Sequence, residues 1–121
     1  MIGMGIDAVD VERFRRLLSR RPGLALRVFT DSERSSMSQR LDPVPGLAAR
    51  FAAKEAAMKA LGTGLGGVRF ADVEVVRDVG GAPHLAVTGQ AARRAHALGV
   101  RSWHLSLTHT SSVAAAVVVA E

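Results

Sequence analysis

The sequence predicts an α+β fold in which a largely antiparallel sheet packs on one long helix. Two observations favour this class. Helical patterns cluster in the first half of the chain, and two short segments joined by a glycine-rich turn predict a hairpin in the second half. The length of 121 residues and the apolar content of 48% suffice for a hydrophobic core, so we expect one domain over residues 1–121. The predicted element order is β-α-α-α-β-β-α-β-β.

The first half begins with a strand over residues 1–10, which are rich in Ile, Val and Met. A helix is expected to follow from about Asp10 to the breaker Pro22-Gly23. Its apolar positions recur at helical spacing, with the arginines mainly between them on the outer face. These apolar positions are Val11, Phe14, Leu17 and Leu18.

Two further helices are predicted before the hairpin. Leu24–Phe29 is only a short apolar piece, but Thr30 and Glu33 fit a capping box, which predicts a helix to about Arg40. A break at 42–46 follows. Leu47–Leu61 then has the strongest helical composition in the chain, because it contains no β-branched residue and no glycine.

The second half alternates short strands with turns. A glycine-rich segment closes the long helix, alternation of apolar and polar residues predicts strands, and Gly99 ends one further helix. The predicted strands are Phe70–Arg77, His84–Val87, Ser102–Thr108 and Ser112–Ala120, and the predicted helix is Gln90–Leu98.

The formal net charge of +5 suggests an anionic partner. The positive charge is local, because five arginines fall within nine residues of the first helix. They are Arg13, Arg15, Arg16, Arg20 and Arg21. Aromatic side chains for base stacking are few, with one Trp and no Tyr, so we do not expect a nucleic-acid binder.

The chain contains no cysteine, which excludes disulfides, thiolate metal sites and a cysteine nucleophile. Its first residues lack the basic and apolar regions of a signal peptide, and no apolar run reaches about 18 residues. We therefore expect a cytoplasmic protein without a membrane segment.

Two carboxylates stand out because each lies in a segment otherwise built for burial. Asp7 falls in the apolar opening strand, and Glu55 falls in the long helix. An ionised carboxylate is costly to bury unless it is paired or binds a metal. Asp7 and Glu55 could therefore meet in the fold and hold one hard cation such as Mg²⁺.

Glu55 shares one helical stripe with Phe51 and Lys59, at i, i+4 spacing. The plainer interpretation is a surface ion pair between Glu55 and Lys59. The functional interpretation is a metal carboxylate beside a phosphate-binding lysine. The glycines that follow would let the backbone approach a pyrophosphate, although they match neither a P-loop nor a dinucleotide fingerprint. They are Gly62, Gly64, Gly66 and Gly67.

A second polar cluster spans Ser106–Ser112, where His109 lies at a strand end among hydroxyl groups. A lone histidine in such a place is more often a structural hydrogen-bonding residue than a catalyst. No nucleophile elbow and no paired-histidine metal motif is present in the sequence.

Two longer segments match a known pattern. Gly5-Ile-Asp-Ala-Val-Asp-Val-Glu-Arg-Phe14 has the form Gly-x-Asp-x-Val-x-x-x-Arg-Phe, and Phe51-Ala-Ala-Lys-Glu-Ala-Ala-Met-Lys-Ala60 has the form Trp/Phe-x-x-Lys-Glu-Ala-x-x-Lys-Ala. Together with Phe29-Thr-x-x-Glu33 and Ser106-x-Thr-His-Thr110, in this order, they resemble the holo-acyl-carrier-protein synthase family, the short bacterial type of 4′-phosphopantetheinyl transferase. The resemblance covers essentially the whole chain. Phe51, where tryptophan is common, is one departure.

The resemblance implies transfer of the phosphopantetheine arm of coenzyme A to a serine of an apo acyl carrier protein, in support of fatty acid biosynthesis. Asp7 and Glu55 would hold Mg²⁺ against the pyrophosphate, and Lys59 would be a third catalytic residue. The residues implied for coenzyme A binding are Arg50, Lys59, Gly62, Gly64, His109 and Thr110. The attacking serine belongs to the substrate, which explains the missing nucleophile motif.

The resemblance also implies a homotrimer with its active site at the subunit interface, and an acidic carrier protein docked on the arginine cluster, including Arg13, Arg16 and Arg20. Glu55 or a metal-bound water is expected to take the serine proton, with Asp31 and Glu33 as weaker candidates. Two alternatives remain open. The acceptor could be a carrier domain of polyketide or peptide synthesis, or the chain could be a small basic module that binds RNA or anionic lipid.

Overall fold

The structure, a computed structural model, describes residues 1–64 and 67–121. Its strands are β1 (Gly3–Asp10), β2 (Val73–Arg77), β3 (Pro83–Val87), β4 (Trp103–His109) and β5 (Val113–Ala120). Its helices are α1 (Val11–Arg20), α2 (Leu24–Val28), α3 (Asp31–Met37), α4 (Val44–Ala60) and α5 (Gly89–Leu98), with a 3₁₀ turn, η1, over Phe70–Asp72.

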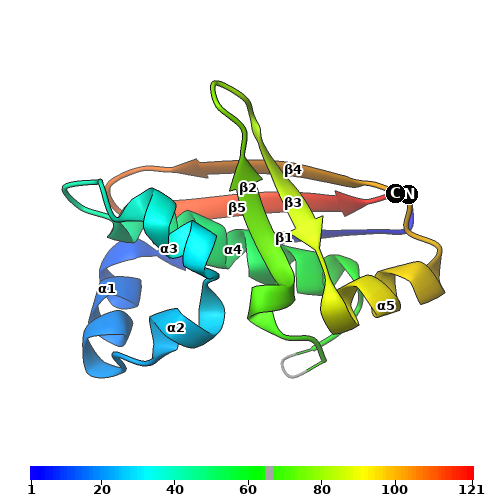
Figure 1. Cartoon of the computed structure of the whole chain (residues 1–121), viewed down its shortest axis with the longest axis horizontal. Helices are drawn as coiled ribbons and strands as arrows, with labels where there is room; N and C mark the ends of the chain where they lie inside the picture. The colour runs from blue at the N-terminus through cyan, green and yellow to red at the C-terminus, as the bar shows by residue number, and fades with distance from the viewer. Residues whose placement is uncertain (65–66) are drawn as a thin grey trace.

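The strands form one three-stranded sheet in the order β1-β5-β4 and a separate hairpin of β2 and β3, all antiparallel. The predicted α+β class with antiparallel pairing is therefore confirmed. The two ends of the chain lie side by side, and α1 lies at the opposite end of the molecule (Figure 1). In the register of β1 with β5, Asp7 is opposite Ala116, which places the acid in the middle of an edge strand.

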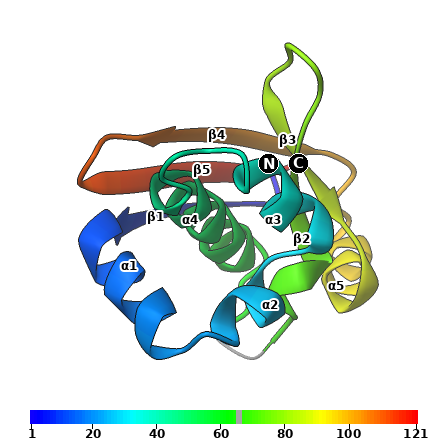
Figure 2. The same ribbon diagram turned by 60° about the vertical axis from the view of Figure 1, so that its left-hand side comes forward.

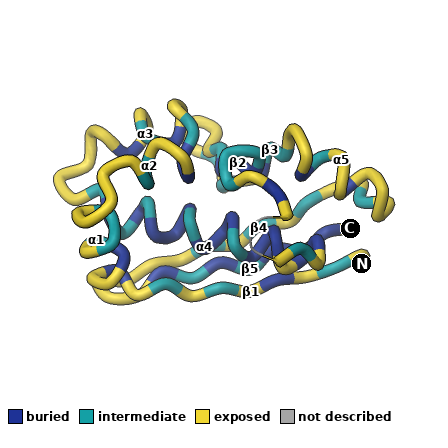
Figure 3. Tube along the Cα trace, turned by 90° about the horizontal axis from the view of Figure 1, so that it is seen from below, coloured by how far each residue is buried: buried dark blue, intermediate teal, exposed yellow. Residues whose placement is uncertain are grey.

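Helix α4 forms the core of the molecule. It lies between the three-stranded sheet and a layer made of the other helices and the hairpin (Figure 2). Most of its residues are buried, and it is dark blue along much of its length in Figure 3. A helix that is apolar on nearly every side must be buried on nearly every side. Alanines supply most of this surface: Ala48, Ala49, Ala52, Ala53, Ala56, Ala57 and Ala60.

Two glycines bring β1 into direct contact with α4. A methyl group at Gly3 would collide with the carbonyl oxygen of Ala60, and one at Gly5 would collide with that of Ala56. Only a residue without a side chain fits this spacing. Because β1 runs this close to α4, Asp7 lies next to the polar stripe of the helix.

Several boundaries differ from the sequence-based predictions. Leu24–Val28, left without structure, is a five-residue helix, and α3 ends at Met37 rather than near Arg40. Helix α4 begins at Val44, three residues earlier than predicted, because Pro45 lies in its first turn, where an amide hydrogen is not needed. The strand expected from Phe70 begins at Val73, after the 3₁₀ turn.

The face of the sheet turned away from α4 carries apolar side chains, and we call it the outer sheet face. Alternation along the strands places one set of residues there. On β1 and β5 this set is Met4, Ile6, Ala8, Ala115, Val117 and Val119. Met4 is 58% exposed and Ile6 is 64% exposed, so this apolar surface is uncovered in a single chain.

Among the described residues, no helix has the length and apolarity needed to cross a membrane.

Candidate active site

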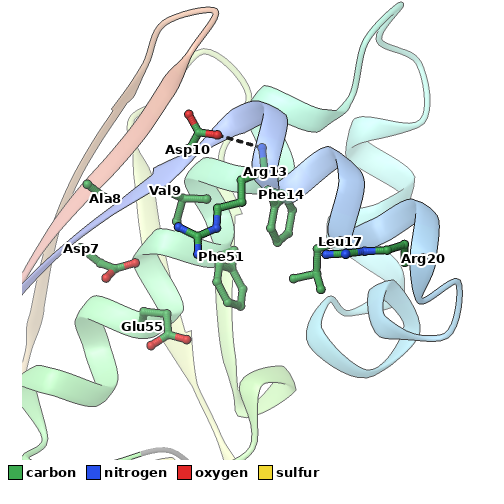
Figure 4. A pocket seen from close by; sticks show the side chains of 10 residues that line it. All are labelled: Asp7, Ala8, Val9, Asp10, Arg13, Phe14, Leu17, Arg20, Phe51 and Glu55. Carbon is green, nitrogen blue, oxygen red and sulfur yellow. Dashed lines mark hydrogen bonds between the residues drawn. The ribbon is translucent and has the colours of Figure 1, made fainter.

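An open cleft of about 500 Å³ lies where β1, α1 and α4 meet. Its lining residues are Asp7, Ala8, Val9, Asp10, Arg13, Phe14, Leu17, Arg20, Phe51 and Glu55. Figure 4 shows Asp7 and Glu55 beside each other at one end of the cleft, and Leu17 and Arg20 at the other. The cleft therefore has an acidic end and an apolar end with a basic edge.

Asp7 and Glu55, 48 residues apart in the sequence, meet in this cleft as predicted. Burial raises the pKa of Glu55 above its usual value. The negative charge of Asp7 raises this pKa further, whereas the positive charge of Lys59 lowers it. Repulsion between two partly desolvated carboxylates is relieved when a cation binds between them. The donor set thus fits the Mg²⁺ that the sequence resemblance implied.

Lys59 is paired with Asp7 across the gap between α4 and β1. Its Nζ atom lies 3.1 Å from Asp7 Oδ1 and donates a hydrogen bond of 2.9 Å to the Ile6 carbonyl oxygen. The plainer alternative, a helical pair of Lys59 with Glu55, is thus replaced by a contact between two elements. Lys59 is held at the acidic end of the cleft, where it can face an anionic ligand.

Two carboxylates are too few to enclose a metal ion by themselves. Within the described residues, no group of three or more His, Cys, Asp or Glu side chains is placed to hold one. Mg²⁺ in proteins often takes only one or two carboxylates and completes its octahedron with water and substrate phosphates. The Asp7–Glu55 pair therefore suits a metal that is shared with a phosphate-containing substrate.

The apolar part of the cleft rests on a row of stacked aromatic rings. The ring of Phe51 lies 5.1 Å from that of Phe14 on α1 and 5.5 Å from that of Phe70 on η1, with interplanar angles of 29° and 28°. Such offset stacks contribute about 0.5–1.5 kcal/mol each beyond their buried area. Phe51, one helical turn before Glu55, thereby joins the cleft to η1.

Helix α1 forms the basic edge of the cleft. Arg13 and Arg20 line it, and Arg16 is exposed on the same helix. Arg15 is engaged elsewhere, because its guanidinium binds Asp42 with two hydrogen bonds of 2.9 and 2.7 Å. The arginines available to a partner are therefore a subset of the predicted cluster.

Among the lining residues that sequence reasoning did not assign to the site are Asp10 and Leu17. Asp10 caps α1 by accepting a 2.8 Å hydrogen bond from the Arg13 amide, and the residue also lines the cleft. Leu17 supplies apolar surface between Arg13 and Arg20. The available signals were an N-cap residue at position 10 and the spacing of Leu17, which is one turn from each arginine.

Arg50 does not line the cleft. It is 4% exposed, and its Nη1 atom donates a hydrogen bond of 3.3 Å to the Gly46 carbonyl oxygen. Its Nε atom has no hydrogen-bond partner among the described residues, and burial lowers the pKa of the guanidinium. The side chain thus retains an unsatisfied donor beneath the surface.

Gly62 has a structural role at the end of α4. Its φ of +70° is the left-handed conformation of a helix C-terminus. The Gly62 amide donates to the Lys59 carbonyl at 3.0 Å, and the Thr63 amide donates to the Met58 carbonyl at 3.1 Å, which is the Schellman pattern. These two amides are thus used by the helix itself. Gly64 lies in the loop that follows, with open space where a side chain would be, and Gly66 lies outside the described residues.

His109 and Thr110 lie at the turn between β4 and β5, outside the cleft lining of the same chain. Thr110 Oγ1 accepts hydrogen bonds from the amides of Ser112 and Val113 at 3.2 and 3.0 Å and so shapes the turn. The exposed side chain of His109 is available to a ligand or to another chain.

Glu33, a weaker candidate for the base, is excluded from that role by its position. Its side chain is fully buried, and it forms an ion pair of 2.8 Å with Lys54. Asp31, the other weak candidate, is exposed on α3 and is paired with Arg34. Of the acids considered as a base, Glu55 is the one that lines the cleft.

Comparisons with known proteins identify the family of the chain. Residues 3–118 match the sequence model of the 4′-phosphopantetheinyl transferase superfamily. The chain belongs to this superfamily, and it is an enzyme of the phosphopantetheinyl transferase class.

The similar proteins with specific names are holo-(acyl-carrier-protein) synthases. The one from Streptomyces avermitilis is 51% identical over 121 residues, which cover 100% of this chain and 98% of the relative. The crystal structure of the synthase from Neisseria meningitidis matches with a TM-score of 0.90 at 34% identity, over 100% of this chain and 98% of that one. The Helicobacter pylori synthase in complex with coenzyme A matches with a TM-score of 0.84 at 27% identity, over 98% and 99% of the two chains.

Proposed function

We propose that this enzyme transfers 4′-phosphopantetheine from coenzyme A to a serine of apo acyl carrier protein, with adenosine 3′,5′-bisphosphate as the second product. The observation that carries the proposal is the meeting of Asp7, Glu55 and Lys59 at one end of a cleft. The names of the relatives and the coenzyme A complex of the Helicobacter pylori synthase support the choice of both substrates.

Asp7 and Glu55 would hold Mg²⁺ in this reaction. When bound, the metal stabilises negative charge on the oxygens of the pyrophosphate being cleaved. Lys59 adds a fixed positive charge beside the same phosphates. Its contacts to Asp7 and to the Ile6 carbonyl hold the ammonium group in place before a ligand arrives.

A proton must leave the attacking serine of the carrier protein. Among the acids considered for this role, Glu55 is the one that lines the cleft, beside the proposed metal and pyrophosphate. We therefore propose Glu55, directly or through a water molecule, as the group that accepts this proton. The chain itself needs no nucleophile, because the serine belongs to its partner.

The carrier protein would dock on α1. Carrier proteins of this type are acidic, and Arg13, Arg16 and Arg20 present positive charge along one side of that helix, next to the cleft. Complementary charge of this kind steers encounter and orients the partner. Leu17, between the arginines, gives the docked partner an apolar contact.

The sequence resemblance implied that Arg50, Gly62, Gly64, His109 and Thr110 bind the nucleotide part of coenzyme A. Arg50 is buried and the Gly62 amide is bonded within α4, so we propose that Gly64, His109 and Thr110 make these contacts. These residues do not line the cleft of a single chain. We propose that the enzyme is a homotrimer and that His109 and Thr110 complete the cleft of a neighbouring copy. The uncovered apolar outer sheet face supports self-association, because such a surface is usually covered in a stable protein.

The cellular role that we propose is activation of the carrier protein of fatty acid biosynthesis, in the cytoplasm. Carrier domains of polyketide or peptide synthesis carry the same serine chemistry and remain the alternative acceptors.

The reaction is tested by mass spectrometry of an apo acyl carrier protein incubated with the enzyme, coenzyme A and Mg²⁺. We expect the carrier to gain the mass of one phosphopantetheinyl group. Asp7→Ala and Glu55→Ala should each abolish the gain and leave the fold intact, because either change removes half of the metal-binding set. Asp78→Ala, a change of equal charge at the exposed β2–β3 turn, is the matched control and should remain active. An unmodified carrier with the unaltered enzyme would refute the proposed reaction, and full activity of Asp7→Ala would refute the metal role.

A further inference from the structure

Lys54, which directly precedes Glu55 on α4, forms a completely buried ion pair with Glu33. Both side chains are 0% exposed, and Lys54 Nζ lies 2.8 Å from Glu33 Oε1. The same Nζ atom donates to the carbonyl oxygens of Phe70 at 3.1 Å and Val73 at 2.5 Å. Three donors thus meet three acceptors, so the buried ammonium group is fully satisfied.

Glu33 is equally well satisfied. Its carboxylate accepts the Thr30 amide at 3.0 Å, which closes the capping box of α3, and the Val75 amide at 2.9 Å, which belongs to β2. The pair therefore ties three separate elements to α4: helix α3, strand β2 and the turn η1. In the chain, α3 directly precedes α4, and η1 and β2 follow it, so the pair joins α4 to elements on both sides of it in the sequence.

The contact with η1 leads back to the cleft. The carbonyl oxygen of Phe70 accepts a hydrogen bond from Lys54, and the ring of Phe70 stacks on that of Phe51, which lines the cleft. Lys54 also directly precedes Glu55 on α4. A change in the position of Nζ would therefore alter the rotation of α4 and the placement of Phe51 together.

Stability alone gives weak grounds for burying two charges. The desolvation of a buried pair roughly offsets its attraction, and apolar replacements of such pairs are often neutral or stabilising. This pair instead supplies directional contacts at fixed points of four elements, which packing alone cannot do. Displacement of a catalytic group by about 1 Å can lower turnover by about 100-fold.

We propose that Lys54, held by Glu33, is a positioning residue of the active site. It sets the rotation of α4 so that Glu55 faces Asp7, and it holds Phe70 against Phe51 as the floor of the cleft. The inference rests on the proposed function. It explains two parts of the sequence resemblance, the Thr30–Glu33 capping box and Lys54, to which the transfer chemistry itself gives no role.

The test compares kcat and KM in two variants, Lys54→Met and Glu33→Gln, well below their melting temperatures. Lys54→Met should lower kcat by about 10- to 100-fold. The KM for the carrier protein should stay near that of the unaltered enzyme, because the arginines of α1 are untouched. Glu33→Gln preserves the shape of the side chain and should lower kcat in the same sense. If the two act as one unit, the double variant should lose less than the product of the single effects.

Leu85→Ala is the control for general destabilisation. Leu85 is a buried core residue on β3 that does not line the cleft, and its truncation is expected to lower the melting temperature while kcat is retained. If Lys54→Met or, where it does not fold, Glu33→Gln keeps kcat within about twofold, the inference is wrong. It is also wrong if Leu85→Ala, at equal loss of melting temperature, loses as much kcat. An unaltered enzyme that transfers nothing would refute the proposed function, and the inference with it.

Discussion

The charges of the three residues proposed to carry the chemistry, two carboxylates and one lysine, do not balance. Asp7 and Glu55 carry two negative charges, and Lys59, which contacts Asp7, carries one positive charge. The surplus is negative at the end of the cleft where the proposed reaction places a pyrophosphate. An anionic substrate can bind there only if a cation arrives with it, so the charges themselves favour joint binding of metal and coenzyme A.

The raised pKa of Glu55 predicts how stability varies with pH. A carboxyl whose folded pKa lies above its unfolded value binds its proton more tightly in the folded state. Its contribution is therefore favourable below the unfolded pKa of about 4.3 and is lost as pH rises through the folded pKa. Glu55→Gln should thus raise the melting temperature of metal-free protein near neutral pH, with the difference shrinking at acid pH. Thermal melts in a chelating buffer across this pH range measure it.

Magnesium with adenosine 3′,5′-bisphosphate should reverse this order. Binding to the folded state stabilises the unaltered protein, whereas Glu55→Gln should gain little. The control is Glu12→Gln, which removes an exposed acid outside the cleft. If the Glu55→Gln variant melts at a lower temperature than the unaltered protein near neutral pH in chelator, the charge at this position is not unfavourable and the prediction is wrong.

At the scale of elements, the spacing between β1 and α4 determines whether the site forms. Gly3 and Gly5 allow the strand backbone to touch the helix backbone, and Lys59 can then reach both the Ile6 carbonyl and Asp7. A side chain at either glycine would separate the two elements that carry the acids.

Gly5→Ala is therefore expected to destabilise the protein by about 1–3 kcal/mol, the usual cost of overpacking, and to lower turnover strongly. Gly23→Ala is the matched control, because a methyl group there meets nothing within 4 Å and φ is −76°. Its stability should change by less than about 1 kcal/mol. Denaturant unfolding and initial rates check both. Equal behaviour of the two variants would show that the spacing of β1 and α4 does not govern the site.

Helix α1 is the element expected to recognise the carrier protein. Arg13→Glu with Arg16→Glu should raise the KM for the carrier several-fold, with a smaller effect on the KM for coenzyme A. The loss should grow as the ionic strength is lowered, since the Debye length increases from about 8 Å at 0.15 M to about 30 Å at 0.01 M. Arg93→Glu on α5, a reversal far from the cleft lining, is the control. An equal rise in both KM values would argue against docking on α1.

The elements themselves could largely be predicted from the sequence, because local rules determine them. The capping box of Thr30 and Glu33 and the alanine-rich α4 are found where composition predicted them. What Glu33 does beyond its cap could not be predicted, because Lys54 is 21 residues away and no periodicity links the two. The partner of Lys59 could not be predicted for the same reason, since it is Asp7 on β1 rather than a residue one turn away on α4.

At the scale of the whole molecule, the outer sheet face is an apolar surface that a single chain leaves uncovered. Antiparallel sheets with one solvated face normally alternate apolar and polar residues. Here β1 and β5 carry apolar residues on both faces, with Met4 paired to Val119 and Ile6 to Val117. On β4, by contrast, polar side chains lie on that face at His104, Ser106 and Thr108. A second copy of the chain is the partner that we propose to cover the apolar part of this face.

Met4→Glu should therefore disrupt the proposed homotrimer, because it introduces a charge on the outer sheet face, the proposed interface. Sedimentation should show a particle with the mass of three chains for the unaltered enzyme and a smaller particle for this variant. Transfer activity should be lost in parallel. Val79→Glu, at the fully exposed β2–β3 turn, should change neither property. An unaltered enzyme that sediments as one chain, or a Met4→Glu variant that stays trimeric, would contradict the proposed assembly.

A shared active site makes a sharper prediction, because two inactive variants should then restore activity to each other. Asp7→Ala lacks the metal site, and His109→Ala lacks the side chain proposed to serve a neighbouring copy. If each cleft takes Asp7 from one chain and His109 from the next, mixed trimers contain some clefts with both residues intact. Unfolding and refolding the two variants together should therefore recover part of the transfer activity, whereas each refolded alone should stay inactive. The composition of the mixed trimers must be demonstrated. If such trimers recover no activity, then either His109 and Asp7 of one chain lie in the same cleft, or His109 lies outside the site.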